Sequence, residues 1–383
     1  MKIYLDNSAT TRPYDEAIEE MVISMKEFYA NPSSIHDMGI EASNRIKKSR
    51  SEIAKSLGVN ENEIVFTSGG TEANNTAIKG ICKSYRRRGN HIISTAIEHS
   101  SVLGTLKSME EEGFRVTYLK PDQEGNITSE QVKNAIEEDT ILVSIMQVNN
   151  ELGTIMPIGE IGQMLSKEDK KIYFHVDGVQ SFMKMEVKPS KLNVDLYSAS
   201  SHKIHGPKGV GFLYIASKTN LKPLLEGGGQ EMGIRSGTEG VPNIIGFGKA
   251  VELERTDMNS RIEKIKGLKE LLRSLLEEKI ENIRINSPID GVCHILNVSF
   301  RGVRGEILLH SLEEQGVYVS TTSACSSKKK GSHVLDLLRL TSEEKEGALR
   351  FSLGNFNSEE EIHQVVKILS EIVPMLRKIT SRR

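Results

Sequence analysis

Short apolar runs alternate with amphipathic stretches between residues 60 and 215 of the chain. Each run is rich in Ile, Val, Leu, Phe or Tyr and ends at small or polar residues. This pattern is typical of buried strands separated by helices or turns, and it predicts an α/β fold with an open sheet. The predicted strands are residues 63–68, 91–96, 114–119, 140–146, 171–177 and 194–200.

The last third of the chain shows a different pattern, which begins after the glycine-rich stretch EGGGQEMGIRSGT. Residues 258–283 carry leucines at one-face helical spacing among alternating charges, which predicts an amphipathic helix. Apolar runs at 293–300 and 316–324 predict two strands, and a capped amphipathic pattern at 358–376 predicts a final helix. This region therefore has the elements of a separate, smaller α+β domain.

The length of the chain supports two domains, because 383 residues exceed the usual size of a single hydrophobic core. We predict a large domain over residues 15–257. The N-terminal residues 1–14 are too few for a domain, so we assign them, together with 258–383, to the small domain. Two domains of this kind predict a cleft between them.

Charge and composition exclude several classes of protein. Lys and Arg total 50 against 52 Asp and Glu, so no overall charge favours nucleic acid or a membrane surface. No run reaches the roughly 18 apolar residues that cross a bilayer, and the start MKIYLDNSATTRPYD lacks the apolar core of a signal peptide. We therefore expect a cytoplasmic protein with a small substrate.

Polar residues follow the predicted strands, and ligands of open α/β sheets bind at such strand ends. The stretch TSGGTEANN opens a helix, so the backbone N–H groups near Gly70 and Thr71 favour an anion; an ordinary tight turn is the alternative. Asp177 suits a cationic ring nitrogen or a helix cap. His99 suits stacking on an aromatic ligand or a local backbone contact. Lys203 alone would be a solvated lysine.

Together, these residues meet the requirements of pyridoxal phosphate. The phosphate would bind at the helix start, Asp177 would pair with the pyridinium nitrogen, and Lys203 would form a Schiff base. Ten motifs then resemble, in order from about residue 3 to 365, the cysteine desulfurases of the NifS/IscS kind, which are class V aminotransferase-like enzymes. These motifs are LDNSATTR, NPSSIH, TSGGTEANN, IEHSSV, NNELGT, HVDGVQS, SSHKIHGPKGVG, GGGQEMGIRSGT, STTSACSS and LRFSLG.

The resemblance implies the fold of type I pyridoxal-phosphate enzymes: a large domain with a mostly parallel central sheet and a smaller α+β domain. It assigns Lys203 as the Schiff-base lysine, His99 as the stacked histidine and Asp177 as the pyridinium partner. Arg350 resembles the clamp for the substrate carboxylate, beside Asn150. The other cofactor residues that it implies are Gly70, Thr71, Asn150, Gln180, Ser200, His202 and, from the other subunit of a homodimer, Thr238.

Cys325 differs from the other two cysteines. It lies in the Ser-, Thr- and Lys-rich stretch STTSACSSKKKGS, whereas Cys82 and Cys293 lie in apolar surroundings and are predicted to be inert packing residues. Neighbouring lysines would favour the nucleophilic thiolate. An accidental surface cysteine is the alternative. By the resemblance, Cys325 is the nucleophile of a cysteine desulfurase.

The resemblance therefore implies a sulfurtransferase that converts L-cysteine to L-alanine and keeps the sulfur as a persulfide on Cys325. The sulfur would pass to an acceptor protein, an iron–sulfur scaffold or a tRNA-thiolation enzyme, and Cys325 could share transient ligation of an iron–sulfur cluster with that scaffold. The alternatives are another enzyme of this fold, such as an aminotransferase or selenocysteine lyase, and a catalytically idle scaffold. Three lysines, 328–330, and a short C-terminus leave the acceptor open.

Overall fold

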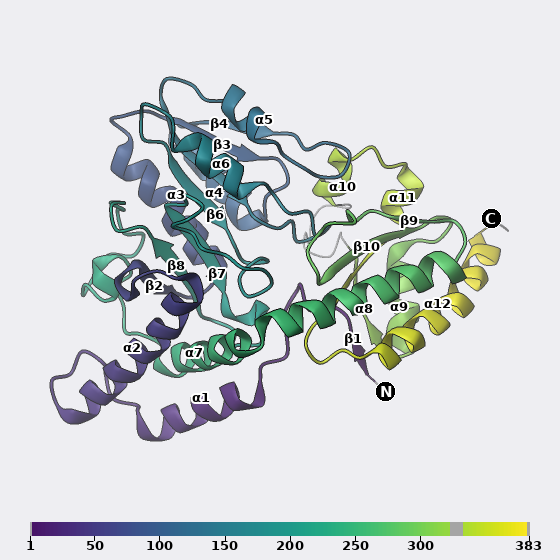
Figure 1. The fold of residues 1–383 in the computed structure, drawn as a ribbon, viewed down its shortest axis with the longest axis horizontal. Coiled ribbons are helices and arrows are strands. Elements are labelled where there is room, and N and C mark those ends of the chain that lie inside the picture. The colour runs from purple at the N-terminus through teal and green to yellow at the C-terminus, as the bar shows by residue number, and fades with distance from the viewer. Residues whose placement is uncertain (1, 322–331, 381–383) are drawn as a thin grey trace.

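A seven-stranded sheet is the centre of the computed structural model, which describes residues 2–321 and 332–380 (Figure 1). The strand order is β2-β8-β7-β6-β5-β3-β4, and of these seven only β8 runs against the others. The carboxyl ends of the other six therefore meet at one edge. The strands are β2 (Ile64–Thr67), β3 (His91–Thr95), β4 (Arg115–Leu119), β5 (Thr140–Met146), β6 (Tyr173–Asp177), β7 (Leu196–Ser200) and β8 (Gly211–Ile215).

Helices cover both faces of this sheet because side chains alternate between the faces along each strand. On β2, Val65 packs in a core with residues of α3 and α4, whereas Ile64 and Phe66 pack in a second core with α2, α6 and α7. The result is a three-layer body. Its helices are α1 (Asp15–Glu27), α2 (Asp37–Leu57), α3 (Gly70–Tyr85), α4 (Ser100–Glu111), α5 (Ser129–Asn134), α6 (Ile158–Leu165) and α7 (Val241–Thr256).

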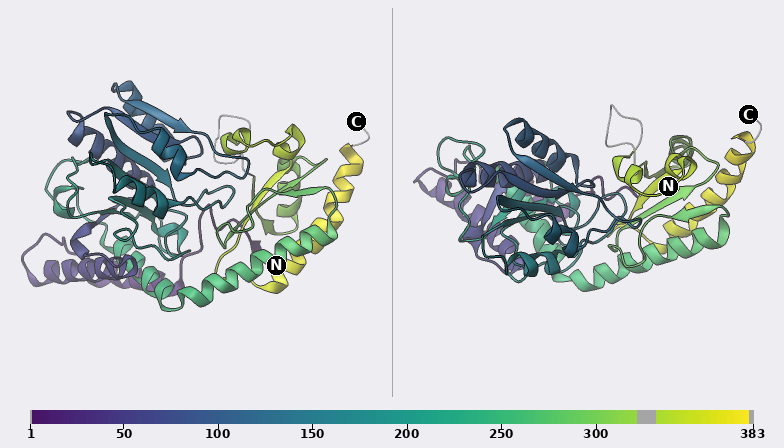
Figure 2. Two further views of the ribbon diagram at one scale, coloured as in Figure 1. Left: turned by 45° about the horizontal axis from the view of Figure 1, so that its top comes forward. Right: turned by 90° about the horizontal axis from the view of Figure 1, so that it is seen from above.

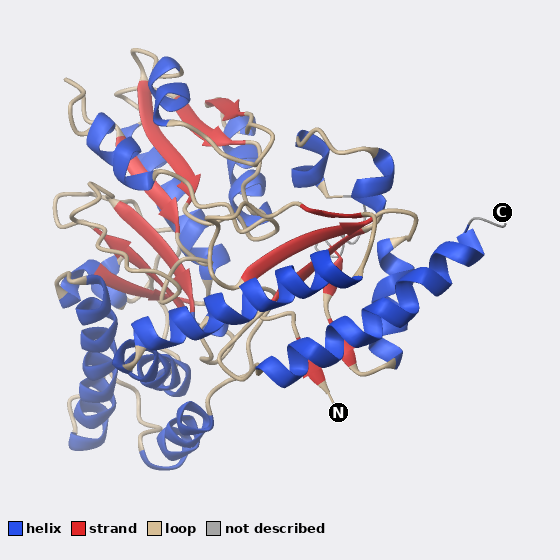
Figure 3. Ribbon diagram, turned by 45° about the vertical axis from the view of Figure 1, so that its right-hand side comes forward, coloured by secondary structure: helices blue, strands red, loops and turns tan. Residues whose placement is uncertain are grey.

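A smaller body contains a four-stranded antiparallel sheet in the order β12-β13-β10-β9. The long helices α8 and α12 lie side by side on it (Figure 3), and their apolar residues form a core with β10 and β13. The elements of this part of the chain are α8 (Met258–Lys279), β9 (Ile283–Ile285), β10 (Ile295–Phe300), α9 (Gly305–Glu314), β11 (Val317–Tyr318), β12 (Ser320–Thr321), α10 (His333–Leu337), α11 (Ser342–Glu346), β13 (Ala348–Ser352) and α12 (Glu359–Thr380).

The two bodies lie side by side (Figure 2), and α8 leads from α7 of the large body along the small one. Two further segments link the two bodies. Near the N-terminus, β1 (Ile3–Tyr4) pairs in parallel with β11, and the chain then runs to the large body. In α10, Val334 and Leu335 pack into the core of the large body, although the flanking strands belong to the small sheet.

The predicted fold class is confirmed: the chain has a mostly parallel central sheet and a smaller α+β part. The predicted helix at 258–283 ends at Lys279, because Ile283 begins β9. The sequence analysis did not name β8, the reversed strand. The domain division at residue 257 remains a proposal, supported by the separate cores and by the meeting of α7 and α8 at Asp257.

Across the described residues, no helix is long and apolar enough to cross a bilayer. Within the same residues, no group of three or more His, Cys, Asp or Glu side chains is arranged to hold a metal ion.

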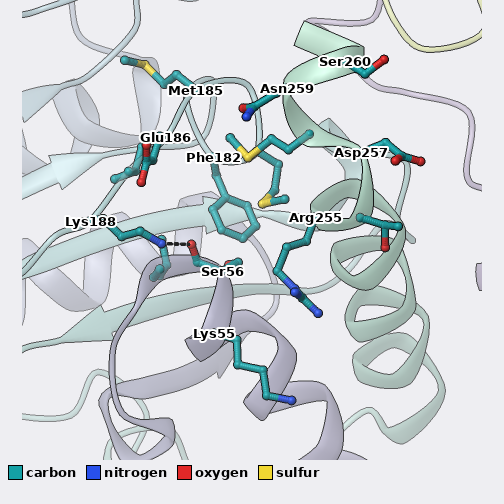
Figure 4. Close-up of a pocket in the computed structure, with 15 residues that line it drawn as sticks. Lys55, Ser56, Phe182, Met185, Glu186, Lys188, Arg255, Asp257, Asn259 and Ser260 are labelled. Carbon is teal, nitrogen blue, oxygen red and sulfur yellow. Dashed lines mark hydrogen bonds between the residues drawn. The ribbon is translucent and has the colours of Figure 1, made fainter.

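A cavity of about 510 Å³ lies between the end of α2, the segment 181–188 and the junction of α7 with α8 (Figure 4). Its apolar wall includes Phe182. The basic groups that line it are already bonded to the protein: Lys55 and Arg255 pair with Glu52, and Lys188 donates to the Ser56 carbonyl. No predicted site residue lines this cavity, so the chemistry lies elsewhere.

Candidate active site

The carboxyl ends of neighbouring parallel strands carry several of the predicted cofactor residues. Asp177 is the last residue of β6, and Lys203 ends a 3-10 turn that directly follows β7. Asn150 follows β5, and His99 lies between β3 and the start of α4. Since β7, β6, β5 and β3 are adjacent, the structure brings these residues to one edge of the sheet.

Asp177 is buried and is linked to His99 through two polar side chains. Asn74 Nδ2 on α3 donates to Asp177 Oδ2 at 2.8 Å and to Ser101 Oγ at 2.9 Å. Ser101 Oγ lies 2.8 Å from His99 Nδ1. The N–H of Val179 donates to the other carboxylate oxygen, Asp177 Oδ1, at 3.0 Å. Asn74 therefore fixes the Asp177 carboxylate, and Ser101 connects Asn74 to His99; neither residue was predicted from the sequence.

His99 is exposed at the strand ends and also caps α4 by accepting from the Ser101 N–H at 3.2 Å. The alternative of a local backbone contact is therefore met by Nδ1. Desolvation lowers the pKa of His99 despite the opposing charge of Asp177, and Lys203 lowers it further. At neutral pH the imidazole is uncharged, and its exposed ring is available for stacking.

Lys203 points at the N-terminal segment. Its Nζ donates to the carbonyl oxygens of Ser8 at 2.6 Å and Ala9 at 2.8 Å. Gln180 Nε2 donates to the same Ser8 oxygen at 2.9 Å. The ammonium group and the Gln180 amide therefore meet at one point, which excludes the reading of Lys203 as a merely solvated lysine.

Gln180 is oriented by a residue that the sequence analysis missed. His294 Nε2 on the small-body side lies 3.2 Å from Gln180 Oε1, and burial holds the pKa of His294 well below its ordinary value. A neutral His294 that donates from Nε2 would fix which end of the amide faces Ser8. No local pattern indicated this contact, because it joins residues far apart in the chain.

The start of α3 forms a narrow cradle beside Ser200. A Cβ atom on Gly70 would lie 2.6 Å from Val179 Cγ2 and 3.7 Å from Ser200 Cβ. Gly69, the cap of α3, has φ +150°, which L side chains rarely adopt. Thr71 is exposed in the first turn. The positive end of this helix therefore combines the backbone N–H groups of its first turn with a close approach to Ser200, an arrangement that suits a phosphate.

His202 lies at the same side of the sheet and contacts the N-terminal segment. Its Nδ1 lies 3.2 Å from Thr10 Oγ1, and the Thr11 N–H donates to its carbonyl at 2.9 Å. Burial lowers the pKa of His202 to about 4, with Lys203 and Lys208 acting in the same direction. A phosphate would meet a neutral imidazole here.

Arg350 is buried on β13 of the small body and reaches across to the large one. Its Nη1 donates to the Asn150 carbonyl at 2.9 Å, and its Nη2 donates to Asp6 Oδ1 at 3.0 Å. Its Nε has no hydrogen-bond partner among the residues that the structure describes. Burial raises the pKa of Asp6 in spite of the facing guanidinium. The predicted substrate clamp is thus already paired with a carboxylate, which the sequence analysis missed.

The structure does not bring every predicted residue to this place. Thr238 is exposed in the glycine-rich segment before α7, and Cys325 lies outside the described residues. Cys82 and Cys293 are buried free thiols, as predicted for packing residues. Burial raises the pKa of Cys82 to about 12 and also raises that of Cys293, so neither is a reactive thiolate at neutral pH.

The donor set fits pyridoxal phosphate by its chemistry. A helix start with a close-packed glycine suits the phosphate, and the buried Asp177, held by Asn74 and Val179, suits a cationic ring nitrogen. An amine at Lys203 suits an aldehyde. The arrangement therefore offers each part of the cofactor a group of matching charge.

Comparison with known proteins agrees with this chemistry. Residues 3–365 match the family model described as aminotransferase class-V, whose members depend on pyridoxal phosphate. The chain is 43% identical over 383 residues to a protein of Clostridium botulinum named cysteine desulfurase IscS, and the match covers 99% of this chain and 96% of that protein.

Two solved structures extend the similarity to three dimensions. One titled NifS-like protein has a TM-score of 0.92 and 40% identity, and the match covers 98% of this chain and all (100%) of that one. Another, titled SspA in complex with cysteine, has a TM-score of 0.83 and 36% identity, with 94% of this chain and 100% of that one covered. The chain therefore belongs to the class V aminotransferase family and, within it, to the cysteine desulfurases of the NifS/IscS kind.

Proposed function

We propose that this cysteine desulfurase holds pyridoxal phosphate covalently at Lys203 and transfers the sulfur of L-cysteine to Cys325. The observation that carries the proposal is the meeting of Lys203 and Gln180 at the Ser8 carbonyl, on the same sheet edge as Asp177. When bound, the cofactor supplies an electron sink for the carbon that loses its proton.

The side chains of the large body would bind the cofactor at three points. Gly70, Thr71, Ser200 and His202 would hold the phosphate. Asp177 would keep the ring nitrogen protonated, with Asn74 fixing its carboxylate, and the neutral ring of His99 would stack on the cofactor. Gln180 and Asn150 would bind beside the phenolic oxygen.

Arg350 would bind the carboxylate of L-cysteine. The Nε and Nη atoms of a guanidinium match a carboxylate in two-point geometry, and the Nε of Arg350 still lacks a partner among the described residues. Once released by the incoming amine of the substrate, Lys203 Nζ would accept the proton from the α-carbon.

Sulfur transfer would then need the Cys325 thiolate, which forms a bond to the substrate sulfur as the carbon–sulfur bond breaks. The bonding pair stays on the departing carbon, which takes up a proton and leaves as part of L-alanine. The sulfur remains as a persulfide on Cys325. An acceptor protein, either an iron–sulfur scaffold or a tRNA-thiolation enzyme, would receive it in the cytoplasm.

A homodimer would complete the phosphate site through Thr238. Thr238 is exposed, yet the segment that leads to it is fixed by two ion pairs: Glu231 pairs with Arg50 at 2.7 Å, and Arg235 pairs with Glu72 at 3.0 Å. A partner surface is also available, because α1 and the segment up to the first turns of α2 expose large apolar side chains. These are Ile18, Val22, Ile23, Met25, Tyr29, Ile35, Met38 and Ile40.

Three measurements on the holoenzyme test the assignments of Lys203 and Cys325. Borohydride reduction followed by peptide mass spectrometry should find the cofactor on Lys203. After one turnover without reductant, one added sulfur atom should be found on the peptide that contains Cys325. Cys325→Ala should keep the visible absorption change on adding L-cysteine but form neither alanine nor persulfide. Sulfur on Cys82 or Cys293 would reject the mechanism.

A further inference from the structure

Glu151 lies in the turn that follows β5 and has no role in the function proposed above. The side chain of Asn149 fixes this turn, because its Oδ1 accepts from the N–H groups of Glu151 at 3.0 Å and Leu152 at 2.9 Å. The Glu151 carbonyl accepts from Asn297 Nδ2 on β10 at 3.2 Å. One residue earlier, the Asn150 carbonyl accepts from Arg350. The turn therefore connects the large body to two strands of the small sheet.

The Glu151 carboxylate is buried and accepts a hydrogen bond from Ser332 Oγ. The same hydroxyl oxygen accepts from the Leu335 N–H at 3.1 Å and so caps α10. Burial raises the pKa of Glu151 to about 7, against the effects of Ser332 and Arg350. A buried carboxylate without its donor is costly, so the pairing of Glu151 with Ser332 is a strong constraint on where α10 begins.

The two neighbours of the Cys325 segment are held by different bodies. Ser320 and Thr321 pair with β13 in the small sheet. Ser332 is bonded to Glu151, and the α10 residues that follow it pack into the core of the large body. In the sequence, Cys325 lies four residues after Thr321 and seven before Ser332. Thr321 and Ser332 are therefore the described residues that flank this segment, one held by each body.

We infer that Glu151 is a positioning residue for sulfur transfer. Its bond to Ser332 fixes the end of the Cys325 segment to the turn that carries Asn150 and contacts Arg350. This inference rests on the proposed role of Cys325, and it predicts that loss of the bond slows persulfide formation and leaves the earlier steps nearly unchanged.

The test compares four variants of the holoenzyme: Glu151→Ala, Ser332→Ala, Glu151→Gln and Thr341→Ala. Glu151→Gln keeps an acceptor for Ser332. Thr341→Ala is the matched control, because Thr341 caps the neighbouring helix α11 as Ser332 caps α10 but has no contact with Glu151. Single-turnover mixing with L-cysteine gives two rates: the visible absorption change and the appearance of the Cys325 persulfide.

Glu151→Ala and Ser332→Ala should each slow persulfide formation about tenfold or more, the scale of leaving one buried hydrogen-bonding group without its partner. Their absorption change should stay within about twofold of wild type, because Lys203, Asp177 and His99 are intact. Glu151→Gln and Thr341→Ala should stay near wild type in both rates. In the enzyme without substrate, hydrogen exchange of residues 332–338 should increase only in the first two variants.

Several results would overturn the inference. An equal slowing of both rates in Glu151→Ala, or a Thr341→Ala enzyme as slow as Ser332→Ala, would reduce Glu151 to a general structural residue. Unchanged persulfide formation in both alanine variants would remove the positioning role. Failure of the proposed function would look different, because wild type itself would then form no persulfide on Cys325.

Discussion

Asp177 and Arg350 are both buried charges at the candidate active site, but they are held in different ways. Asp177 receives its hydrogen bonds from Asn74 and from the Val179 N–H, all within the large body. Arg350 lies in the small sheet, and its bonds go to the Asn150 carbonyl of the large body and to Asp6 of the N-terminal segment. One charge is fixed inside a single core, and the other is fixed where three segments meet.

This difference matches the two tasks that we propose for these residues, cofactor binding by Asp177 and substrate binding by Arg350. Groups that bind a permanent cofactor can be built into one rigid sheet edge, where strand geometry alone places them. A group that binds and releases substrate is better placed across an interface, because its partners are exchangeable. Asp6 occupies Arg350 Nη2, so the substrate carboxylate would compete with a carboxylate of the protein itself.

The largest expected effect comes from removing the fixed charge. Asp177→Asn keeps the shape of the side chain but cannot hold a proton on the ring nitrogen by charge, so kcat should fall about a thousandfold, the scale of one strong electrostatic contribution to a transition state. Steady-state alanine production measures this. Asp195→Asn is the control, since it removes another buried carboxylate of the large body, one that pairs with Lys171. A comparable loss in Asp195→Asn would contradict a specific role for Asp177.

A smaller effect is expected when Arg350, the charge with exchangeable partners, is altered. Arg350→Lys keeps the positive charge but loses the planar two-point donor, so kcat/KM for L-cysteine should fall about a hundredfold. Most of this should appear in KM, because cofactor binding remains intact. Arg301→Lys, which alters a half-exposed ion pair with Glu344, should have little effect. If Arg350→Lys instead lowers kcat alone, Arg350 does not bind the substrate carboxylate.

The sequence indicated the residues that we propose for the cofactor but not the groups that orient them, for a physical reason. Asp177, Lys203 and His99 follow apolar runs, and the alternation of strands and helices places all strand ends at one edge. Asn74, Ser8 and His294 follow no such rule. Each reaches its partner through tertiary packing between segments far apart in the chain, as when Asn74 bonds Asp177 across 103 positions.

The same limit applies to the fold. Hydrophobic periodicity predicted the core strands and the amphipathic helices, because burial on one face leaves a local pattern. It could not show that α10, which follows strands of the small sheet, docks on the large body. Val334 and Leu338 are apolar residues four positions apart, which is helical spacing, but either core could accept them. The partner of an amphipathic helix is decided by the shape of the whole molecule.

Asp6 provides a more sensitive test of whether the partners of Arg350 are exchangeable. Asp6→Asn keeps an oxygen that can accept from Arg350 but removes the charge that competes with the substrate. KM for L-cysteine should therefore fall about threefold with little change in kcat, as expected for weakening one partly exposed ion pair. Asp15→Asn, which removes an exposed pair with Arg12, is the control. An increase in KM would show that Asp6 is needed to orient Arg350 rather than to compete for it.

The last expected effect concerns stability rather than activity: it is a change in how stability depends on pH at the interface between the bodies. Burial raises the pKa of Glu151 to about 7 from its ordinary value of 4.5, so between these values the folded protein binds this proton more tightly than the unfolded chain does. The resulting stabilisation is complete below pH 4.5 and is lost as pH rises toward 7. Glu151→Gln has no such proton. The free energy of unfolding of the variant, relative to that of wild type, should therefore increase as the pH rises from 5 to 8.

Denaturant unfolding at several pH values, with cofactor saturating, measures the difference. Glu160→Gln alters an exposed residue and is the control: its free energy of unfolding should depend on pH in the same way as that of wild type. A Glu151→Gln curve that is also parallel to wild type would show that Glu151 is ionised in the folded protein throughout this range.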